Sequence, residues 1–321
     1  MNLLRNARDY LCKKSIWFRR TYNSIWPVME LKYNANDSKP KKRILLILNL
    51  IAIFTRKILK KMTGKLETAY MEFVITTKCT LKCKDCANLL QHYKNPYNIC
   101  IEELKKHFDK LMDVFDYIHI LSVIGGEPFM HPQISELIAY ICQSNKIGAV
   151  RITTNGTLIP GKKTLDALKN PKITVKLSNY GKYSSKLEAL KNILSENNIK
   201  YHVMNLDYWF DYGGTEARNR GAHELQDIFS DCRTPLCQSY LNGEFHFCPR
   251  SSAGVDLGLV PKKESDYVNI GKLETKEARK QMKKFLSKTK FVQACDYCDN
   301  SYRLPLARIK PGIQKTIKIS I

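Results

Sequence analysis

Three cysteines, Cys79, Cys83 and Cys86, follow one another with the spacing CxxxCxxC. Three thiolates at this spacing can each bind one iron of a four-iron cubane cluster and leave the fourth iron without a protein ligand. An iron with an open position is a place for chemistry rather than a plain electron carrier. A zinc site is the alternative, although zinc prefers four ligands and usually takes them from paired CxxC motifs.

Glycine-rich and polar segments follow the predicted strands downstream of these cysteines. Gly125-Gly126-Glu127-Pro128 comes directly after the second strand. Glycine lets a chain approach a ligand closely, and a carboxylate suits an ammonium group. Thr153-Thr154-Asn155-Gly156 ends the third strand and Ser178 ends the fourth, although residues of these types are also ordinary turn chemistry.

At these residues the sequence resembles the radical S-adenosylmethionine (radical SAM) superfamily over roughly residues 70–205. The resemblance implies that the three cysteines hold a catalytic 4Fe-4S cluster whose open iron chelates S-adenosylmethionine. Reduction then cleaves this cofactor to a 5′-deoxyadenosyl radical, which abstracts a substrate hydrogen. The residues that the resemblance assigns to cofactor binding are Gly125, Gly126, Glu127, Thr154, Asn155 and Ser178. Asp85 departs from the family pattern, because many relatives carry an aromatic or apolar residue there, in contact with adenine.

A second group of cysteines lies downstream: Cys232, Cys248 and the CxxC pair Cys295 and Cys298. Their arrangement resembles the twitch type of auxiliary domain, a shortened relative of the SPASM domain, which implies that these four ligate a second 4Fe-4S cluster. Four thiolates would saturate that cluster, which suits electron transfer. A zinc knuckle is the alternative. Cys237 is left over, and it could replace Cys232 as a ligand, donate a hydrogen atom to a substrate radical, or simply be buried.

The segment from Asp207 to Arg218 joins the two cysteine regions and is rich in aromatic and hydrogen-bonding residues. Such a segment suits a polyhydroxylated substrate, and it could equally be a solvated linker. Twitch-bearing relatives include dehydrogenases of aminocyclitols. The leading prediction is therefore an enzyme that oxidises or epimerises a carbohydrate-like small molecule, with a peptide- or protein-modifying maturase and a zinc-stabilised membrane-associated binding protein as alternatives. The candidate catalytic residues are Asp207, Asp211, Glu216, Arg218 and Cys237.

The elements that must position these residues alternate between short apolar runs and amphipathic stretches. Strands are predicted at 70–76, 117–124, 149–154, 173–177 and 201–205, with helices at 101–115, 134–144, 164–169 and 185–196 between them. Alternation of this kind implies a parallel sheet, and chemistry gathers at the carboxyl ends of such strands. We expect an α/β protein with a partial (β/α) TIM-like barrel of five to six parallel strands over residues 67–225. An auxiliary iron-sulfur domain is expected at 226–321, where Asn242-Gly243 predicts a hairpin turn.

Charge is concentrated at the beginning of the chain. The 321 residues carry a formal net charge of +23, and residues 1–66 hold 16 Lys and Arg against 3 Asp and Glu. This extension predicts either a basic amphipathic helix on an anionic membrane surface or a helix packed on the enzyme body. Nucleic acid is not expected as a partner, because stacking aromatics do not interleave with the basic residues.

The 11 cysteines are odd in number and tightly clustered, and no signal peptide is recognised near Met1. This pattern indicates metal or cofactor binding in a reducing compartment rather than a secreted disulfide framework. We therefore expect a cytoplasmic location, with peripheral contact at the inner face of the membrane as an open alternative. A reducing partner such as flavodoxin or ferredoxin is expected as the source of electrons.

Overall fold

The computed structural model describes residues 64–235 and 237–315. The predicted basic extension, residues 1–66, lies almost entirely outside the described residues, so its contact with membrane stays a prediction. Within the described ranges, no helix combines the length and apolar character that crossing a membrane requires.

A nine-stranded sheet forms the centre of the fold, and most of its neighbouring strands run parallel. Its order is β10-β9-β8-β2-β3-β4-β5-β6, while β1 pairs with β3 beside this path, and a separate two-stranded sheet joins β11 to β7. The strands are β1 (Glu67–Thr68), β2 (Met71–Thr76), β3 (Tyr117–Gly125), β4 (Ile147–Thr154), β5 (Ile173–Asn179), β6 (Tyr201–Asn205), β7 (Trp209–Phe210), β8 (Ser239–Leu241), β9 (Glu244–His246), β10 (Tyr267–Asn269) and β11 (Arg308–Ile309).

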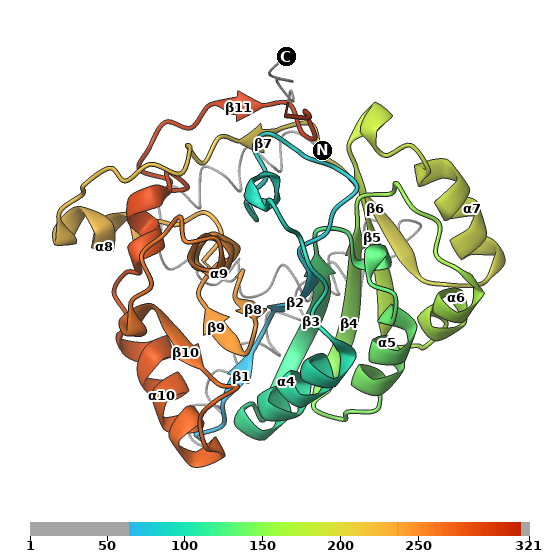
Figure 1. The fold of residues 1–321 in the computed structure, drawn as a ribbon, viewed down its shortest axis with the longest axis horizontal. Helices are drawn as coiled ribbons and strands as arrows, with labels where there is room; N and C mark the ends of the chain where they lie inside the picture. The colour runs from blue at the N-terminus through green and yellow to red at the C-terminus, as the bar shows by residue number, and fades with distance from the viewer. Residues whose placement is uncertain (1–63, 236, 316–321) are drawn as a thin grey trace, which may run out of the picture.

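Helices cover the outer face of the curved sheet (Figure 1). The α-helices within the described residues are α4 (Ile101–Val114), α5 (Ile134–Cys142), α6 (Lys162–Leu168), α7 (Leu187–Glu196), α8 (Ala222–Ser230), α9 (Pro249–Asp256) and α10 (Thr275–Lys288). In α4 the buried residues recur every three or four positions, which gives the helix one apolar stripe. Glu102 and Glu103 occupy its first turn, where negative charge complements the helix dipole.

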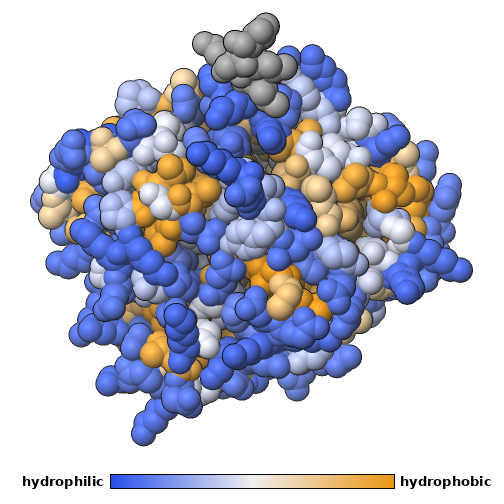
Figure 2. Space-filling model, in the orientation of Figure 1, coloured by the Kyte–Doolittle hydropathy of each residue, from blue (hydrophilic) through white to orange (hydrophobic). Residues whose placement is uncertain are grey.

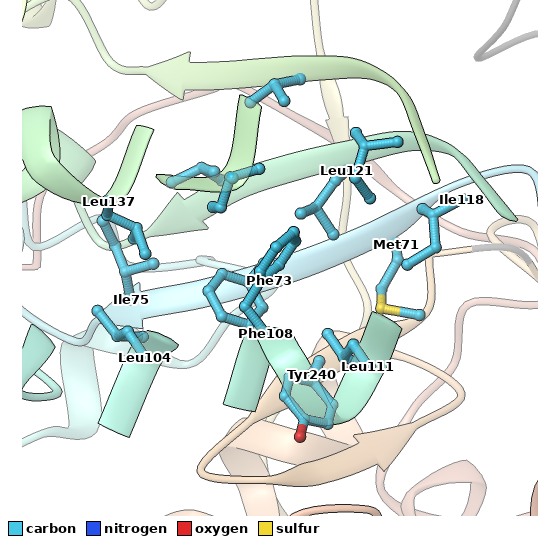
Figure 3. Close-up of a cluster of buried hydrophobic side chains, with 14 of the residues drawn as sticks. Met71, Phe73, Ile75, Leu104, Phe108, Leu111, Ile118, Leu121, Leu137 and Tyr240 are labelled. Carbon is cyan, nitrogen blue, oxygen red and sulfur yellow. The ribbon is translucent and has the colours of Figure 1, made fainter. Parts of the chain in front are cut away.

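The main core lies between β2 and α4 (Figure 3). Phe73 of β2 stacks on Tyr240 of β8 at a centroid distance of 5.8 Å and meets Phe108 of α4 edge to face at 6.5 Å. Since side chains alternate along a strand, the burial of Phe73 and Ile75 on the helix side directs Glu72 and Val74 toward the opposite, inner face. The inner face of the sheet therefore carries the side chains that can meet a ligand.

The predicted hairpin forms between β8 and β9. Asn242 and Gly243 adopt φ angles of 51° and 80°, as a two-residue turn of this type requires. Strand β8 also pairs in parallel with β2, through Glu72 opposite Ser239. The cysteine-rich second half of the chain thus extends the same sheet, and the division at residues 225 and 226 stays a prediction.

The predicted α/β class is confirmed, with six parallel strands from β8 to β6. Within the described part of the chain, β6 and β10 end the main path of the sheet, which does not close into a barrel. Every predicted strand and helix is present with ends shifted by a few residues, whereas α8, α9 and α10 were not predicted.

One face of the molecule is mostly hydrophilic, with its apolar residues in small separate groups (Figure 2).

Candidate active site

The loop after β2 carries Cys79, Cys83 and Cys86 at the carboxyl edge of the sheet, and all three line one cavity of about 500 Å³. Nitrogen donors meet two of the sulfurs. The Leu81 amide lies 3.4 Å from Cys79 Sγ, and Gln314 Nε2 lies 3.5 Å from Cys83 Sγ. Such N–H groups suit sulfurs that carry negative charge.

Burial raises the pKa of the Cys79 thiol to about 12 and that of the Cys83 thiol to about 11, with further contributions from the charges of neighbouring cysteines. The pKa of Cys86 is raised by burial as well. Burial and the charges of neighbouring thiolates both make it harder for these thiols to ionise. A cationic group that binds the three sulfurs would stabilise the thiolates and displace their protons. Among the described residues, no group of three or more His, Cys, Asp or Glu side chains is spaced for a single metal ion. A 4Fe-4S cluster would take one thiolate on each of three irons, so these cysteines could hold it without meeting at a single ion.

Gly125 and Gly126 allow β3 to end directly against the cysteine loop. A Cβ atom on Gly125 would lie 2.3 Å from the Thr76 carbonyl oxygen, and one on Gly126 would lie 2.1 Å from the Lys78 carbonyl oxygen. The close approach that was predicted for a ligand is therefore made, in this structure, to the backbone that precedes Cys79. Both glycines also line the cavity.

Glu127 lies behind this wall, fully buried. One carboxylate oxygen accepts hydrogen bonds from the Thr154 hydroxyl at 2.9 Å and the Asn155 amide at 2.8 Å, and the other accepts from the Phe129 amide at 3.2 Å. Burial raises its pKa to about 7 in spite of these hydrogen bonds. Glu127 thus ties the end of β3 to the end of β4, a role that the sequence did not predict.

The loop after β4 is in turn attached to the cysteine loop. Asn155 Nδ2 lies 3.0 Å from Thr80 Oγ1 and 3.6 Å from Cys79 Sγ. Thr154, Asn155 and Ser178 all line the cavity, as does Asp85, the residue that departs from the family pattern. Three strand ends and the cysteine loop therefore form one connected edge.

A segment near the end of the described chain, residues 313–315, also holds the cysteine loop in place. The sequence analysis did not predict this contact. The Lys84 amide donates to the Ile313 carbonyl at 2.7 Å, and the Lys315 amide donates to the Lys82 carbonyl at 2.7 Å. Upstream of this contact, β11 pairs with β7 at the aromatic rim of the cavity (Figure 1). No local sequence signal marks Gln314 as a neighbour of Cys83, because the two are 231 residues apart.

The second cysteine group lines a separate cavity of about 350 Å³. All four predicted ligands are present there: Cys232, Cys248, Cys295 and Cys298. Burial raises the pKa of the Cys248 thiol to about 12, and the thiols of the other three cysteines are close enough to influence one another electrostatically. Amides donate to Cys232 Sγ and Cys298 Sγ, each at 3.4 Å. The chemistry of this donor set fits a cluster saturated by protein thiolates.

Ala87 and Tyr212 line both cavities and so form their common wall. Arg250, which is buried, lines the second cavity. Burial raises the pKa of Cys86 on one side and of Cys298 on the other, and the charge of Arg250 offsets part of each rise. Arg250 was not identified from the sequence, although it follows Cys248 by only two positions. A cation shared by two groups of thiolates stabilises both.

The candidate catalytic residues separate in the structure. Asp207 lines the first cavity, whereas Asp211, Glu216 and Arg218 are not among its described lining residues. Asp211 accepts a hydrogen bond from the Gly213 amide, and Arg218 forms an ion pair with Asp299 at 2.7 Å. These contacts stabilise the segment next to the second cavity.

Cys237 is half-buried and lies close enough to Glu72, Lys176 and Cys232 for their charges to affect its pKa, which burial raises. It is not among the described residues that line either cavity. Its three predicted alternatives therefore stay open.

Comparison with known proteins covers the part of the chain that carries most residues of the first cavity. Residues 73–207 match the family model described as Radical SAM superfamily. The antilisterial bacteriocin subtilosin biosynthesis protein AlbA of Bacillus subtilis is 36% identical over 100 residues, which are 31% of this chain and 21% of AlbA. A GTP 3′,8-cyclase of Syntrophomonas wolfei is 31% identical over 96 residues, which are 28% of this chain and 27% of that protein. The chain therefore spans less than a third of the length of either relative.

Among solved structures, BtrN in complex with AdoMet and 2-DOIA aligns with a TM-score of 0.43 and 16% identity, over 77% of this chain and 96% of BtrN. The cysteine loop, the glycine-rich end of β3 and the polar ends of β4 and β5 all lie within the family match. The expected catalytic cofactors, a 4Fe-4S cluster and S-adenosylmethionine, are confirmed as those of this family. Through residues 73–207, the chain belongs to the radical SAM superfamily.

Proposed function

We propose that this chain is a radical SAM enzyme that removes a hydrogen atom from a peptide substrate. The observation that carries the proposal is the arrangement of two thiol-lined cavities on either side of Ala87 and Tyr212. S-adenosylmethionine bound at a 4Fe-4S cluster supplies a 5′-deoxyadenosyl radical on reduction. The protein residues hold this cofactor, orient the substrate and exclude water.

Each part of the first cavity has a distinct task under this proposal. Cys79, Cys83 and Cys86 hold the catalytic cluster, and Gly125 and Gly126 provide backbone at the end of β3. Asn155 and Ser178 offer hydrogen-bonding groups at the ends of β4 and β5. Glu127 keeps two of these strand ends together, because both of its oxygens already accept hydrogen bonds within the protein.

We further propose that Cys232, Cys248, Cys295 and Cys298 bind an auxiliary 4Fe-4S cluster within the domain at 226–321. Four thiolates leave no open iron, so this cluster would accept or pass on an electron. A flavodoxin- or ferredoxin-like protein would supply the electron that starts the reaction.

A peptide is proposed as the substrate in place of the carbohydrate-like molecule that led the sequence predictions. The relative AlbA acts in the biosynthesis of a bacteriocin, and its similarity to this chain is carried by sequence. The cavity has a volume of about 500 Å³, and its lining includes Tyr208, Trp209 and Phe210. Aromatic faces of this kind can pack against peptide side chains as well as sugars.

The test is transfer of deuterium into 5′-deoxyadenosine under anaerobic reducing conditions. The anaerobically purified protein is incubated with S-adenosylmethionine and either a pool of deuterated peptides or a pool of deuterated sugars and aminocyclitols. Label transfer from the peptide pool supports the proposal. Transfer from the sugar pool alone would restore the carbohydrate prediction, and a protein that releases no 5′-deoxyadenosine would refute both.

A further inference from the structure

A groove of about 670 Å³ lies between α10 and β10, and none of its described lining residues lines either thiol-lined cavity. We call it the α10 groove. Strand β10 ends the main path of the sheet on this side, and α10 packs against it. Among the lining residues, Val268 and Phe285 are buried and Phe291 is half-buried. Around them the groove is lined by five exposed lysines: Lys263, Lys280, Lys284, Lys288 and Lys290.

Positive charge is concentrated around the α10 groove. Residues 1–66 account for 16 of the 53 Lys and Arg and 3 of the 30 Asp and Glu, so the remaining 255 residues carry a net charge of +10. Residues 262–290 alone hold 10 Lys and Arg against 4 Asp and Glu, and so supply +6 of that charge. Three acids line the groove beside the lysines, and one of them, Asp266, is buried and accepts hydrogen bonds from the Gln293 amide and the Ser265 hydroxyl. A surface of this kind attracts an acidic partner.

One segment of chain separates the α10 groove from the second cavity. Phe291 and Gln293 line the groove, whereas Val292, Ala294 and Cys295 line the second cavity. Neighbouring residues of one stretch therefore face opposite sides of the same wall. Cys295 is one of the four thiols proposed to hold the auxiliary cluster, so the groove is the outer side of that site.

An aromatic pair crosses this wall at a second place. Phe285 of α10 lines the groove and Phe247 lines the second cavity, and their ring centroids lie 4.5 Å apart. Electron tunnelling falls steeply with distance, so a carrier protein must come close to a redox centre to exchange an electron with it. The α10 groove offers such an approach at a positively charged surface.

We propose that the α10 groove is the docking surface for an acidic one-electron carrier protein of the flavodoxin type, which delivers its electron to the auxiliary cluster. This surface rests on the proposed function and deepens it, because it names the place where the electron enters. The reduced flavin of the carrier loses one electron and the cluster gains it, and no bond is formed or broken. Transient partners of this kind meet through small interfaces and are steered by complementary charge.

The test reverses three exposed charges at the groove, through Lys284→Glu, Lys288→Glu and Lys290→Glu combined in one variant. A matched control reverses three exposed charges elsewhere: Lys162→Glu, Lys163→Glu and Lys200→Glu. The first two of these belong to α6, which lies across the molecule from α10 (Figure 1). Both variants change the net charge equally, so only the position of the charge differs. The probes are a bacterial flavodoxin and parvalbumin, a small acidic protein without a redox group.

Binding is measured anaerobically by isothermal titration calorimetry on the reconstituted full-length protein. We expect wild type and the control to bind flavodoxin equally and the groove variant to bind it about tenfold more weakly, because each reversal replaces an attraction at the interface by a repulsion. Thermal denaturation checks that both variants are folded, and the neutral set Lys284→Gln, Lys288→Gln and Lys290→Gln should give an intermediate affinity. Equal weakening in the groove variant and the control, equal binding of parvalbumin and flavodoxin, or no binding of flavodoxin by wild type would overturn the proposal.

The route of the electron is followed by stopped-flow absorbance of the flavodoxin hydroquinone, mixed with protein in the absence of S-adenosylmethionine. Oxidation of the flavin should be slowed in the groove variant. It should also be slowed in Cys298→Ser, which lacks one thiol of the second group but keeps the lysines and binds flavodoxin as wild type does. Oxidation by Cys298→Ser at the wild-type rate would show that the electron enters elsewhere, and the proposal would then be wrong.

The docking surface and the proposed function fail in different ways. Label transfer into 5′-deoxyadenosine with dithionite as the reductant tests the function without any carrier. A protein that transfers label from peptides but binds flavodoxin independently of the groove lysines keeps the function and loses the docking surface. A protein with lysine-dependent binding and electron transfer that moves no label from peptides does the reverse.

Discussion

Gly126→Ala tests how the end of β3 positions the cysteine loop. The added Cβ would lie 2.1 Å from the Lys78 carbonyl oxygen, 2.5 Å from the Lys78 carbonyl carbon and 2.7 Å from Cys79 Cβ. Normal carbon contacts are about 3.5 to 4.0 Å, so the loop must move by roughly 1 Å or more. Overpacking of this kind costs about 1–3 kcal/mol, which corresponds to a fall in Tm of about 2–10 °C.

The displaced segment leads directly into Cys79, so we expect the variant to lose the first cluster and keep the second. Anaerobically reconstituted wild type should hold about eight irons per chain, and Gly126→Ala about four. Iron analysis and thermal denaturation measure the two effects. Gly161→Ala is the matched control, because a Cβ there meets no atom within 4 Å and its φ of −70° suits any residue. If Gly126→Ala matches this control in both iron content and Tm, the reasoning about close packing is wrong.

Three further substitutions examine other parts of the account. Cys298→Ser removes one of four thiols around the second cavity and should lower the iron content from about eight to about four per chain, whereas undiminished iron would argue against a cluster there. Gln314→Ala removes the N–H donor to Cys83 Sγ. Because such donors raise the reduction potential of a cluster, an EPR-monitored redox titration should give a lower potential for the first cluster than in wild type. An equal or higher potential would contradict this. Glu72→Gln removes an acid whose pKa burial raises to about 7 from 4.5, with Tyr70, Arg151, Lys176 and Cys237 around it. Because the folded-state pKa is raised, ionisation of Glu72 destabilises the folded protein increasingly as pH rises from about 4.5 to about 7. In denaturant unfolding, the free energy of unfolding of the variant should therefore exceed that of wild type by up to about 3 kcal/mol at pH 8 and by little at pH 4. A lower free energy of unfolding at pH 8 would contradict this.

Features with local sequence signals were predictable. The stripe of apolar residues in α4 and the Asn242-Gly243 turn depend on neighbours a few positions apart, and both agree with the structure. The CxxxCxxC spacing places three thiols on one short loop wherever that loop lies. Helix α10 also carries such a signal, because its buried Ala278, Met282 and Phe285 recur at helical spacing, and it could have been found.

Features that depend on distant contacts were not predictable from one sequence. Gln314 reaches Cys83 only because β11 pairs with β7 and leads the chain back over the cysteine loop. Arg250 affects both cysteine groups only because the hairpin places α9 between them. Arg218 was a candidate catalytic residue, and its ion pair with Asp299, 81 residues away, gives it a structural contact.

The buried acids show the same limit in a different way. Sequence reasoning selected Glu127 from its motif and passed over Glu72, which looks like an ordinary strand residue. Only the folded chain shows that the oxygens of Glu127 already have donors within the protein, whereas Glu72 Oε2 is buried without one among the described residues. Whether a buried polar atom has a hydrogen-bond partner depends on the tertiary structure, so only the folded chain shows it.

The release of 5′-deoxyadenosine tests the central claim most directly. Wild type and a variant with Cys79→Ala, Cys83→Ala and Cys86→Ala are reconstituted anaerobically with iron and sulfide, reduced and supplied with S-adenosylmethionine. The account predicts a brown wild type that releases 5′-deoxyadenosine and a variant that keeps about four irons, those of the second cluster, but releases none. A wild type that binds zinc in place of iron, or a variant that cleaves S-adenosylmethionine as fast as wild type, would contradict it.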